Sequence, residues 1–300
     1  MFKAITTHTK ANIAMALSVM ALSFSGFFVR WADAPGPITS LFRMAFTALL
    51  LTPFVLKKRS LRSFTKKQII FPLLAGVFSA MDHYFWSTAV GYTTVANAIL
   101  FNYIAPVWVA LIAYFLYKEK LTLKFWGGMG LTMVGALTIF GNDLLHHPQI
   151  GLGDSLAIIS SFFYAGYFLF SQQGRKVTQV VEYLWLVTLA ATLTLTIAAL
   201  FNGMPISGYS GTTILTFISA AVFAQAVGYL SLSYASGHLS ASVISPTMIL
   251  QPVVTALLAV PILGEPITIQ LIIAAPLILI GILLINQKDA PLKTKAKSLA

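Results

Sequence analysis

Two stretches of this chain repeat each other: YTTVANAILFNYIAPVWVALIAYFLYKEKLT (residues 92–122) and YASGHLSASVISPTMILQPVVTALLAVPILGEPIT (residues 234–268). At an offset of 146 residues, residues 92–122 align without a gap with residues 238–268, so that Pro106 falls on Pro252 and Glu119 falls on Glu265. Beyond the two stretches, Gly135 falls on Gly281 at the same offset. Apolar helices share Leu, Val and Ala by chance, but matched Pro, Glu and Gly residues indicate an internal repeat.

The composition around this repeat is that of an integral membrane protein. Of the 300 residues 58% are hydrophobic and 9% are charged, and the mean hydropathy is +0.85. Soluble domains carry about 25% charged residues. Ten apolar runs of near-spanning length are bounded by charges, Pro or Gly. We expect spans at residues 12–31, 38–56, 68–87, 95–117, 122–141, 154–173, 182–201, 212–232, 240–262 and 268–286.

The positions of Lys and Arg predict the orientation of these spans. With the N-terminus in the cytoplasm, all but two of the 19 basic residues fall in cytoplasmic segments. The two exceptions are Arg30, at an outer boundary, and Arg43, inside a span. Because basic residues are retained on the cytoplasmic side, we expect a multi-pass protein of the cell inner membrane with both termini in the cytoplasm.

The offset pairs the third, fourth and fifth spans with the eighth, ninth and tenth. A shift of five crossings reverses the direction of each span, so the two halves are predicted to be inverted repeats. Many secondary transporters are built in this way around a site near the membrane midplane. We expect an all-α protein with a first repeat over residues 1–145, a second over 146–288, and a basic cytoplasmic tail over 289–300.

The two repeated stretches resemble the EamA repeat of the drug/metabolite transporter superfamily, with its mid-helix Pro and a Glu closing the fourth helix. The segment SLFRMAFTALLLTPFVL (residues 40–56) is similar to the family's second helix, and GDSLAIISSFFYAGYFLFSQ (residues 153–172) is similar to the opening of its sixth. The resemblance implies ten helices around a central cavity and transport as the activity. It does not imply a substrate.

Ionisable residues inside the membrane point to a candidate substrate-binding site, because they are costly there and usually face a cavity or a partner. Arg43 and Asp82 each lie about five residues, or roughly 8 Å, from the outer surface, so they could pair. Arg43 or His83 could meet an anionic group of a solute, with Asp82 orienting one of them. The alternatives are a structural ion pair, a snorkelling arginine and a hydrogen-bonded structural histidine.

Polar and aromatic residues on other central spans extend this candidate site. Membrane amides need a partner, which is either another helix or a ligand. Pro106 and Pro252 each lack an N–H, so we expect helix breaks there that line the cavity. The further candidates are Trp86, Asn102, Tyr103, Tyr164, Tyr167, Gln225, Tyr229 and Gln251.

Other chemistries find little support in the sequence. The chain has no Cys, and the His146–His147 pair stands without other ligands, so we expect no metal, no cofactor and no catalytic residue. The Gly208–Ser210–Gly211 motif of intramembrane serine proteases lacks a suitably placed His. The net charge of +11 does not indicate nucleic-acid binding in a membrane protein, since the basic residues that produce it lie mainly in the predicted cytoplasmic connections.

We therefore expect a secondary transporter, not an enzyme, that moves a small organic metabolite by alternating access. The solute is expected to be amino acid-like or a related compound, with export or exchange as the direction. We expect a monomer or homodimer in the lipid bilayer. A carrier of phosphorylated or nucleotide-linked solutes, and an intramembrane enzyme, are the alternatives.

Overall fold

The computed structural model describes residues 6–58, 64–146, 151–264 and 266–286, and every regular element among them is a helix. The basic tail at 289–300 lies outside the described residues, as do Glu265 and His147. In chain order the elements are α1 (Thr7–Ser23), α2 (Ser25–Trp31), α3 (Gly36–Lys58), α4 (Lys66–Ala89), α5 (Val95–Asn102), α6 (Ala105–Phe115), α7 (Leu123–His146), α8 (Leu152–Arg175), α9 (Val180–Phe201), α10 (Gly211–Ala220), the π-helix η2 (Ala221–Gly228), α11 (Tyr229–Ser236), α12 (Ala241–Thr247), α13 (Leu250–Leu263) and α14 (Ile269–Asn286).

These elements form ten helical units that are long and apolar enough to cross a membrane, counted over the described ranges. The ten coincide with the ten predicted spans to within a few residues at each end. The first unit joins α1 and α2, the fourth joins α5 and α6, the eighth joins α10, η2 and α11, and the ninth joins α12 and α13. The prediction of an all-α protein with ten membrane-spanning helices is confirmed.

The fourth and ninth units are broken where the two prolines were expected to break them. α5 ends at Asn102 and α6 starts at Ala105, one residue before Pro106. In the other half α12 ends at Thr247 and α13 starts at Leu250, two residues before Pro252. The proline ring removes a donor and collides with the preceding turn. The two breaks fall at equivalent places in the two repeats.

The packing of α7 on α14 shows the inverted relation of the halves directly. A Cβ placed on Gly128 would lie 2.6 Å from the carbonyl oxygen of Gly281, and one placed on Gly135 would lie 3.2 Å from that of Ala274. At the offset of 146, Gly128 corresponds to Ala274 and Gly135 to Gly281. Swapping the two repeats therefore turns the Gly128–Gly281 contact into the Gly135–Ala274 contact. Because the residue number rises along one helix as it falls along the other, the two helices run antiparallel. The small-residue ridge on α7 permits this close approach.

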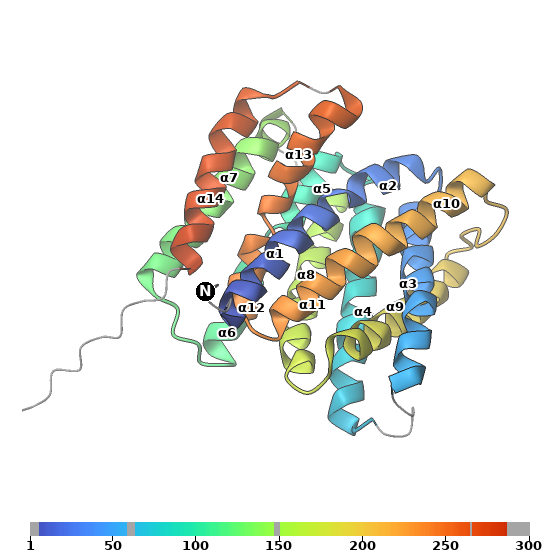
Figure 1. The fold of residues 1–300 in the computed structure, drawn as a ribbon. Coiled ribbons are helices and arrows are strands. Elements are labelled where there is room, and N and C mark those ends of the chain that lie inside the picture. Colours follow the sequence, from blue (N-terminus) through green and yellow to red (C-terminus); the bar gives the residue numbers. More distant parts are fainter. Residues whose placement is uncertain (1–5, 59–63, 147–150, 265, 287–300) are drawn as a thin grey trace, which may run out of the picture.

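The contacts between the remaining helices also occur in equivalent pairs, one for each repeat. α4 of the third unit packs on α8 of the sixth, and the eighth unit, through η2 and α11, packs on α1 of the first. α4 also packs on α9, as η2 packs on α3, while α3 and α9 contact each other. Figure 1 shows α7 and α14 at one edge of the molecule and α3, α9 and α10 at the opposite edge.

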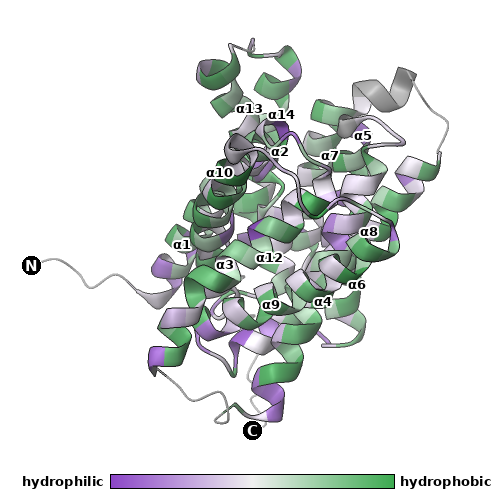
Figure 2. Cartoon of the chain, turned by 90° about the vertical axis from the view of Figure 1, so that its right-hand side faces the viewer, coloured by the Kyte–Doolittle hydropathy of each residue, from purple (hydrophilic) through white to green (hydrophobic). Residues whose placement is uncertain are grey.

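The outer surface is apolar along the helices, as a lipid-facing surface has to be. Leu49, Phe54, Leu193 and Leu283 are each more than 60% exposed although they lie within membrane-spanning units. Figure 2 shows hydrophobic residues over the flanks of the helices and hydrophilic ones gathered toward helix ends. The charged residues Arg43 and Asp82 are instead buried, 6% and 7% exposed.

Candidate functional site

The guanidinium of Arg43 lies against the imidazole of His83, which joins α3 to α4. Arg43 Nη2 donates to His83 Nε2 at 2.5 Å, and His83 Nδ1 lies 2.7 Å from the carbonyl oxygen of Ser79. Arginine can only donate, so Nε2 accepts and the ring proton must sit on Nδ1, which donates to Ser79. The imidazole is thus held as the neutral Nδ1–H tautomer. Both of its ring nitrogens are occupied by the protein.

The carboxylate of Asp82 is held by the broken fourth unit. Asn102, the last residue of α5, donates through Nδ2 to Asp82 Oδ1 at 2.9 Å and lies 2.7 Å from Ser160 Oγ on α8. Asp82 Oδ2 lies 3.7 Å from His83 Nδ1. Arg43 and Asp82 interact electrostatically, but the hydrogen-bond partner of Arg43 is His83. Among the described residues no hydrogen bond or ion pair joins Arg43 directly to Asp82, and the imidazole of His83 lies next to both side chains.

Three tyrosines from two further units lie beside these charges. Tyr164 and Tyr167 on α8 stack with ring centroids 6.4 Å apart, and Tyr167 meets Tyr229 of α11 edge-on at 5.8 Å. The side chain of Tyr229 lies near those of Arg43 and Asp82. Tyr103 follows Asn102 at the break and stacks at 6.5 Å on Phe140 of α7. The second, third, fourth, sixth and eighth units thus meet at one buried cluster.

Gln225 is fully buried in the π-helix η2, which packs against α1 and α3. Neither its amide nitrogen nor its amide oxygen has a hydrogen-bond partner among the described residues. The carbonyl of Ala221, one turn earlier, accepts from Thr47 Oγ1 of α3 at 3.1 Å. A buried unsatisfied polar group costs about 1–3 kcal/mol, and π-helical turns are frequent at functional sites. The amide of Gln225 therefore has hydrogen-bonding capacity that no described residue uses.

Two of the candidate residues lie outside the Arg43–Asp82 cluster. The side chain of Gln251 donates to the carbonyl of Leu22 at 3.1 Å, and its own carbonyl accepts from Ser23 Oγ at 3.1 Å. Leu22 and Ser23 lie at the end of α1, where the first unit breaks at Phe24, so Gln251 joins α13 to that break. Trp86 packs with a small apolar cluster around Ala89, beyond Asp82 on α4.

Sequence reasoning missed three parts of this centre. Ser160 bonds to Asn102, and the Ser160–Ser161 pair on an apolar helix was a signal for it. The first unit breaks at Phe24, in a Ser–Phe–Ser–Gly stretch that favours a bend over a continuous helix. The π-helix η2 had no sequence signal that we recognise. None of the three is an ionisable residue.

The buried cluster brings polar groups of several kinds together. It contains one guanidinium, one carboxylate, tyrosine hydroxyls and aromatic faces, and the N-terminus of α6 begins beside Asn102 and Tyr103. Half-helix ends of this kind bind polar groups of substrates in transporters. Two surface grooves lie away from this cluster, one between α1 and α11 and one between α3 and the α8–α9 turn.

The fold and the buried cluster are those of a multi-pass membrane protein built from two inverted repeats with broken helices at the centre, an architecture common among secondary transporters. The chain belongs to the EamA-like transporter family, whose model matches twice, over residues 9–141 and 151–287.

Several relatives carry transporter names, and a solved structure has the same fold. The chain is 24% identical over 269 residues to an uncharacterized transporter of Clostridium kluyveri, which covers 84% of each protein. It is 25% identical over 271 residues to an uncharacterized transporter of Archaeoglobus fulgidus, covering 90% of this chain and 94% of the relative. A solved crystal structure superposes with a TM-score of 0.77 at 16% identity over 92% of this chain and 96% of the other, which shows the fold alone.

A shorter part of the chain is similar to a protein whose name states an activity. Over 74 residues, 25% of this chain and 67% of the relative, the chain is 33% identical to a probable 4-amino-4-deoxy-L-arabinose-phosphoundecaprenol flippase subunit, ArnE, of Hamiltonella defensa. The names of these relatives are those of transporters and of a flippase subunit. They leave the solute of this chain open.

Proposed function

We propose that this chain is a secondary transporter that moves a small organic metabolite across the cell inner membrane by alternating access. The observation that carries the proposal is the buried polar cluster at the junction of two inverted halves, where Asn102 of a broken helix donates to Asp82 and Arg43 contacts His83. A buried charge in a membrane is costly, so such groups usually line a substrate or ion pathway. Rocking of one half against the other would expose the cluster to each side in turn.

The proposed solute is amino acid-like or a related metabolite, exported or exchanged. Arg43 and Asp82 offer one charge of each sign in the same cluster, which suits a solute with both an anionic and a cationic group. Gln225 adds a free donor and a free acceptor. The tyrosines around the cluster supply apolar faces with polar tips. In this assignment His83 orients Arg43, because its own two nitrogens already have partners.

A carrier of phosphorylated or nucleotide-linked solutes fits the cluster less well. A phosphate group is usually bound by several basic side chains. Among the described residues of the cluster, Arg43 is the one Lys or Arg. Its charge is also opposed by Asp82. An intramembrane enzyme would need reactive groups aimed at a common point, whereas the imidazole of His83 is engaged on both sides.

The proposed organisation keeps the first repeat at residues 1–145, the second at 146–288 and a basic tail after residue 288, with both termini in the cytoplasm. Lys10, Lys66, Lys67 and Lys120, at the ends of the described units, all fall on the cytoplasmic side in this arrangement. The protein is proposed to act as a monomer or homodimer.

Flux through the purified protein tests the proposal. Full-length protein in liposomes should take up or release one class of compound from a panel of labelled amino acids, related amines and nucleotide sugars, and the flux should saturate with concentration. The same assay with and without a pH gradient tests for proton coupling. Absence of flux for every compound, together with absence of any compound-induced thermal shift, would argue against transport.

A further inference from the structure

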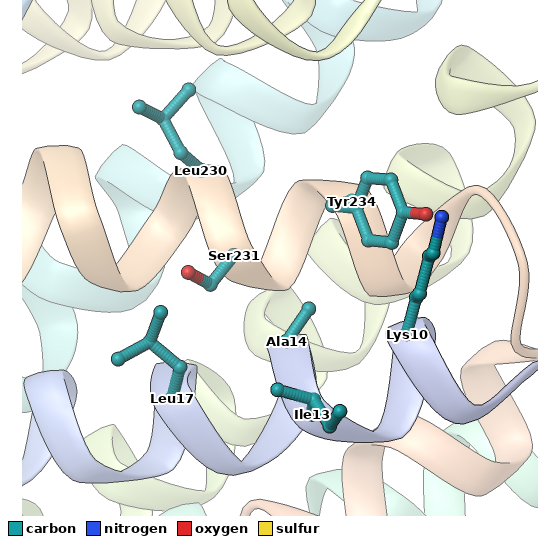
Figure 3. Close-up of a pocket in the computed structure, with 7 residues that line it drawn as sticks. All are labelled: Lys10, Ile13, Ala14, Leu17, Leu230, Ser231 and Tyr234. Atoms are coloured by element: carbon teal, nitrogen blue, oxygen red, sulfur yellow. The ribbon is translucent and has the colours of Figure 1, made fainter. Parts of the chain in front are cut away.

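A groove with a volume of about 370 Å³ runs along the outside of the bundle, between α1 and α11. Figure 3 shows its lining: Lys10, Ile13, Ala14 and Leu17 come from α1, and Leu230, Ser231 and Tyr234 come from α11. It is wide open on one side, and Ile13 and Leu17 are about half exposed at its edge. Both helices belong to membrane-spanning units, so this open side faces lipid.

The groove is polar at one end and apolar along the rest. Figure 3 shows the side-chain ends of Lys10 and Tyr234 close together at one end, with Leu17 and Leu230 at the other. Lys10 lies in the second turn of α1, at the membrane boundary, and Leu17 is seven residues, or about 10 Å, deeper along the helix. The polar end therefore lies at headgroup level, where Tyr side chains are enriched.

The ammonium of Lys10 has no counterion within the part of the chain that the structure describes. It makes neither a hydrogen bond nor an ion pair there. None of the seven lining residues is acidic. Ser231, one turn deeper than Tyr234, has a hydroxyl without a bonded partner in the same ranges. From the membrane surface inward the groove thus presents a cation, two hydroxyls and an apolar channel.

We propose that this groove binds an anionic glycerophospholipid from the leaflet at the N-terminal side of the membrane. The phosphate lies against Lys10 and Tyr234, the ester-linked glycerol lies at the depth of Ser231, and one acyl chain follows Ile13, Leu17 and Leu230. A basic residue at the headgroup level attracts anionic lipids, and apolar side chains solvate the acyl chain. The site joins the first unit to the eighth, so the lipid stabilises the contact between the two halves.

Native mass spectrometry of the detergent-purified full chain tests this site. With phosphatidylglycerol and phosphatidylcholine of identical acyl chains in equal amounts, phosphatidylglycerol adducts should predominate about fivefold, the effect of one basic residue near the surface. Lys10→Gln should abolish that preference. Lys67→Gln, an exposed lysine at the same membrane boundary but outside the groove, should retain it. Leu230→Trp, which fills the apolar channel, should weaken the binding of both lipids.

The other results overturn the proposal. An unchanged preference in Lys10→Gln, or an equal loss in Lys67→Gln, would show that the attraction is spread over the basic face. Unchanged adducts in Leu230→Trp would place the lipid elsewhere. Displacement of phosphatidylglycerol by an equal amount of oleate would show that the groove takes a single fatty-acid chain and not a phospholipid.

Discussion

Gln225 and Gln251 are chemically identical side chains in the membrane interior, and the protein uses them in opposite ways. Gln251 donates to the carbonyl of Leu22 and fastens α13 to the break in the first unit. Gln225 is fully buried with both amide atoms unpaired among the described residues. The amide of Gln251 stabilises this conformation, whereas the unpaired amide of Gln225 destabilises it. The amide of Gln225 therefore needs an explanation other than stability. Under the proposed function that explanation is the solute.

Replacing each glutamine by methionine, which has a similar shape and no hydrogen-bonding amide, separates these two roles. Gln225→Met should leave the protein equally stable or about 1 kcal/mol more stable, because an unsatisfied buried group is removed, and should lower flux at least about tenfold. Gln251→Met should lose about 1 kcal/mol of stability through its lost hydrogen bond. Thermal unfolding in detergent and liposome flux measure the two effects. Equal behaviour of the two variants would contradict this division.

Asp82 is the second residue whose role can be tested alone. Asp82→Asn keeps the size of the side chain but removes the charge that faces Arg43 and weakens the bond from Asn102, so flux should fall about tenfold. Asp33→Asn is the matched control, because Asp33 is an exposed aspartate in a loop at φ 42°, a conformation that Asn accepts. If Asp82→Asn keeps normal flux and expression, Asp82 has no orienting or coupling role.

The sequence predicted the members of the cluster better than their connections. Charge and amide residues inside apolar runs pointed to Arg43, Asp82 and Asn102, since few residues of this kind are tolerated there. That His83 would stand between Arg43 and Asp82 depends on side-chain directions across two helices, which sequence spacing does not determine. Gln251 was grouped with the site because of Pro252, but its partner is a backbone carbonyl freed by a break that no proline marks.

At the scale of the helices, the contact of α7 with α14 depends on glycine. A methyl group on Gly128 would lie 2.6 Å from the carbonyl of Gly281, while one on Gly127 or Gly130 would meet nothing within 4 Å. Gly128→Ala should therefore lower stability by about 1–3 kcal/mol, the usual cost of overpacking. Gly127→Ala and Gly130→Ala should be neutral or slightly stabilising, because Ala favours the helix.

The same prediction applies to the glycine on the other side of this contact, Gly281 of α14. Gly281→Ala should cost about as much as Gly128→Ala, since its methyl group would lie 2.6 Å from the carbonyl of Gly128. Thermal unfolding of the purified variants in one detergent compares all four. A Gly128→Ala protein as stable as the Gly127→Ala protein would show that the two helices can separate without loss.

The sequence also predicted helices unequally well. Pro106 and Pro252 marked the breaks in the fourth and ninth units, because proline has a direct steric effect on the turn before it. The π-helix η2 and the break at Phe24 lie where the first and eighth units pack together, and a Cβ placed on Gly228 would lie 2.9 Å from the side chain of Leu22. The π-helix leaves no local pattern that we recognise, whereas the break at Phe24 has only the weak signal of the Ser–Phe–Ser–Gly stretch around it.

At the scale of the whole molecule, the orientation can be tested because the chain has no cysteine of its own. Ser207 and Lys120 are exposed in connections on opposite sides of the predicted membrane. In intact cells a membrane-impermeant maleimide should label Ser207→Cys at once and label Lys120→Cys only after permeabilisation. The reverse labelling pattern would place both termini outside the cell and invert the proposed topology.

The central claim is that two inverted halves carry a solute by alternating access, and counterflow tests it most directly. Liposomes containing the purified protein are loaded with an excess of the unlabelled solute found in the flux panel, and a trace of labelled solute is added outside. A carrier whose site faces one side at a time should accumulate the label transiently above its equilibrium level. Entry of the label at the same rate with and without internal solute, without any overshoot, would contradict alternating access.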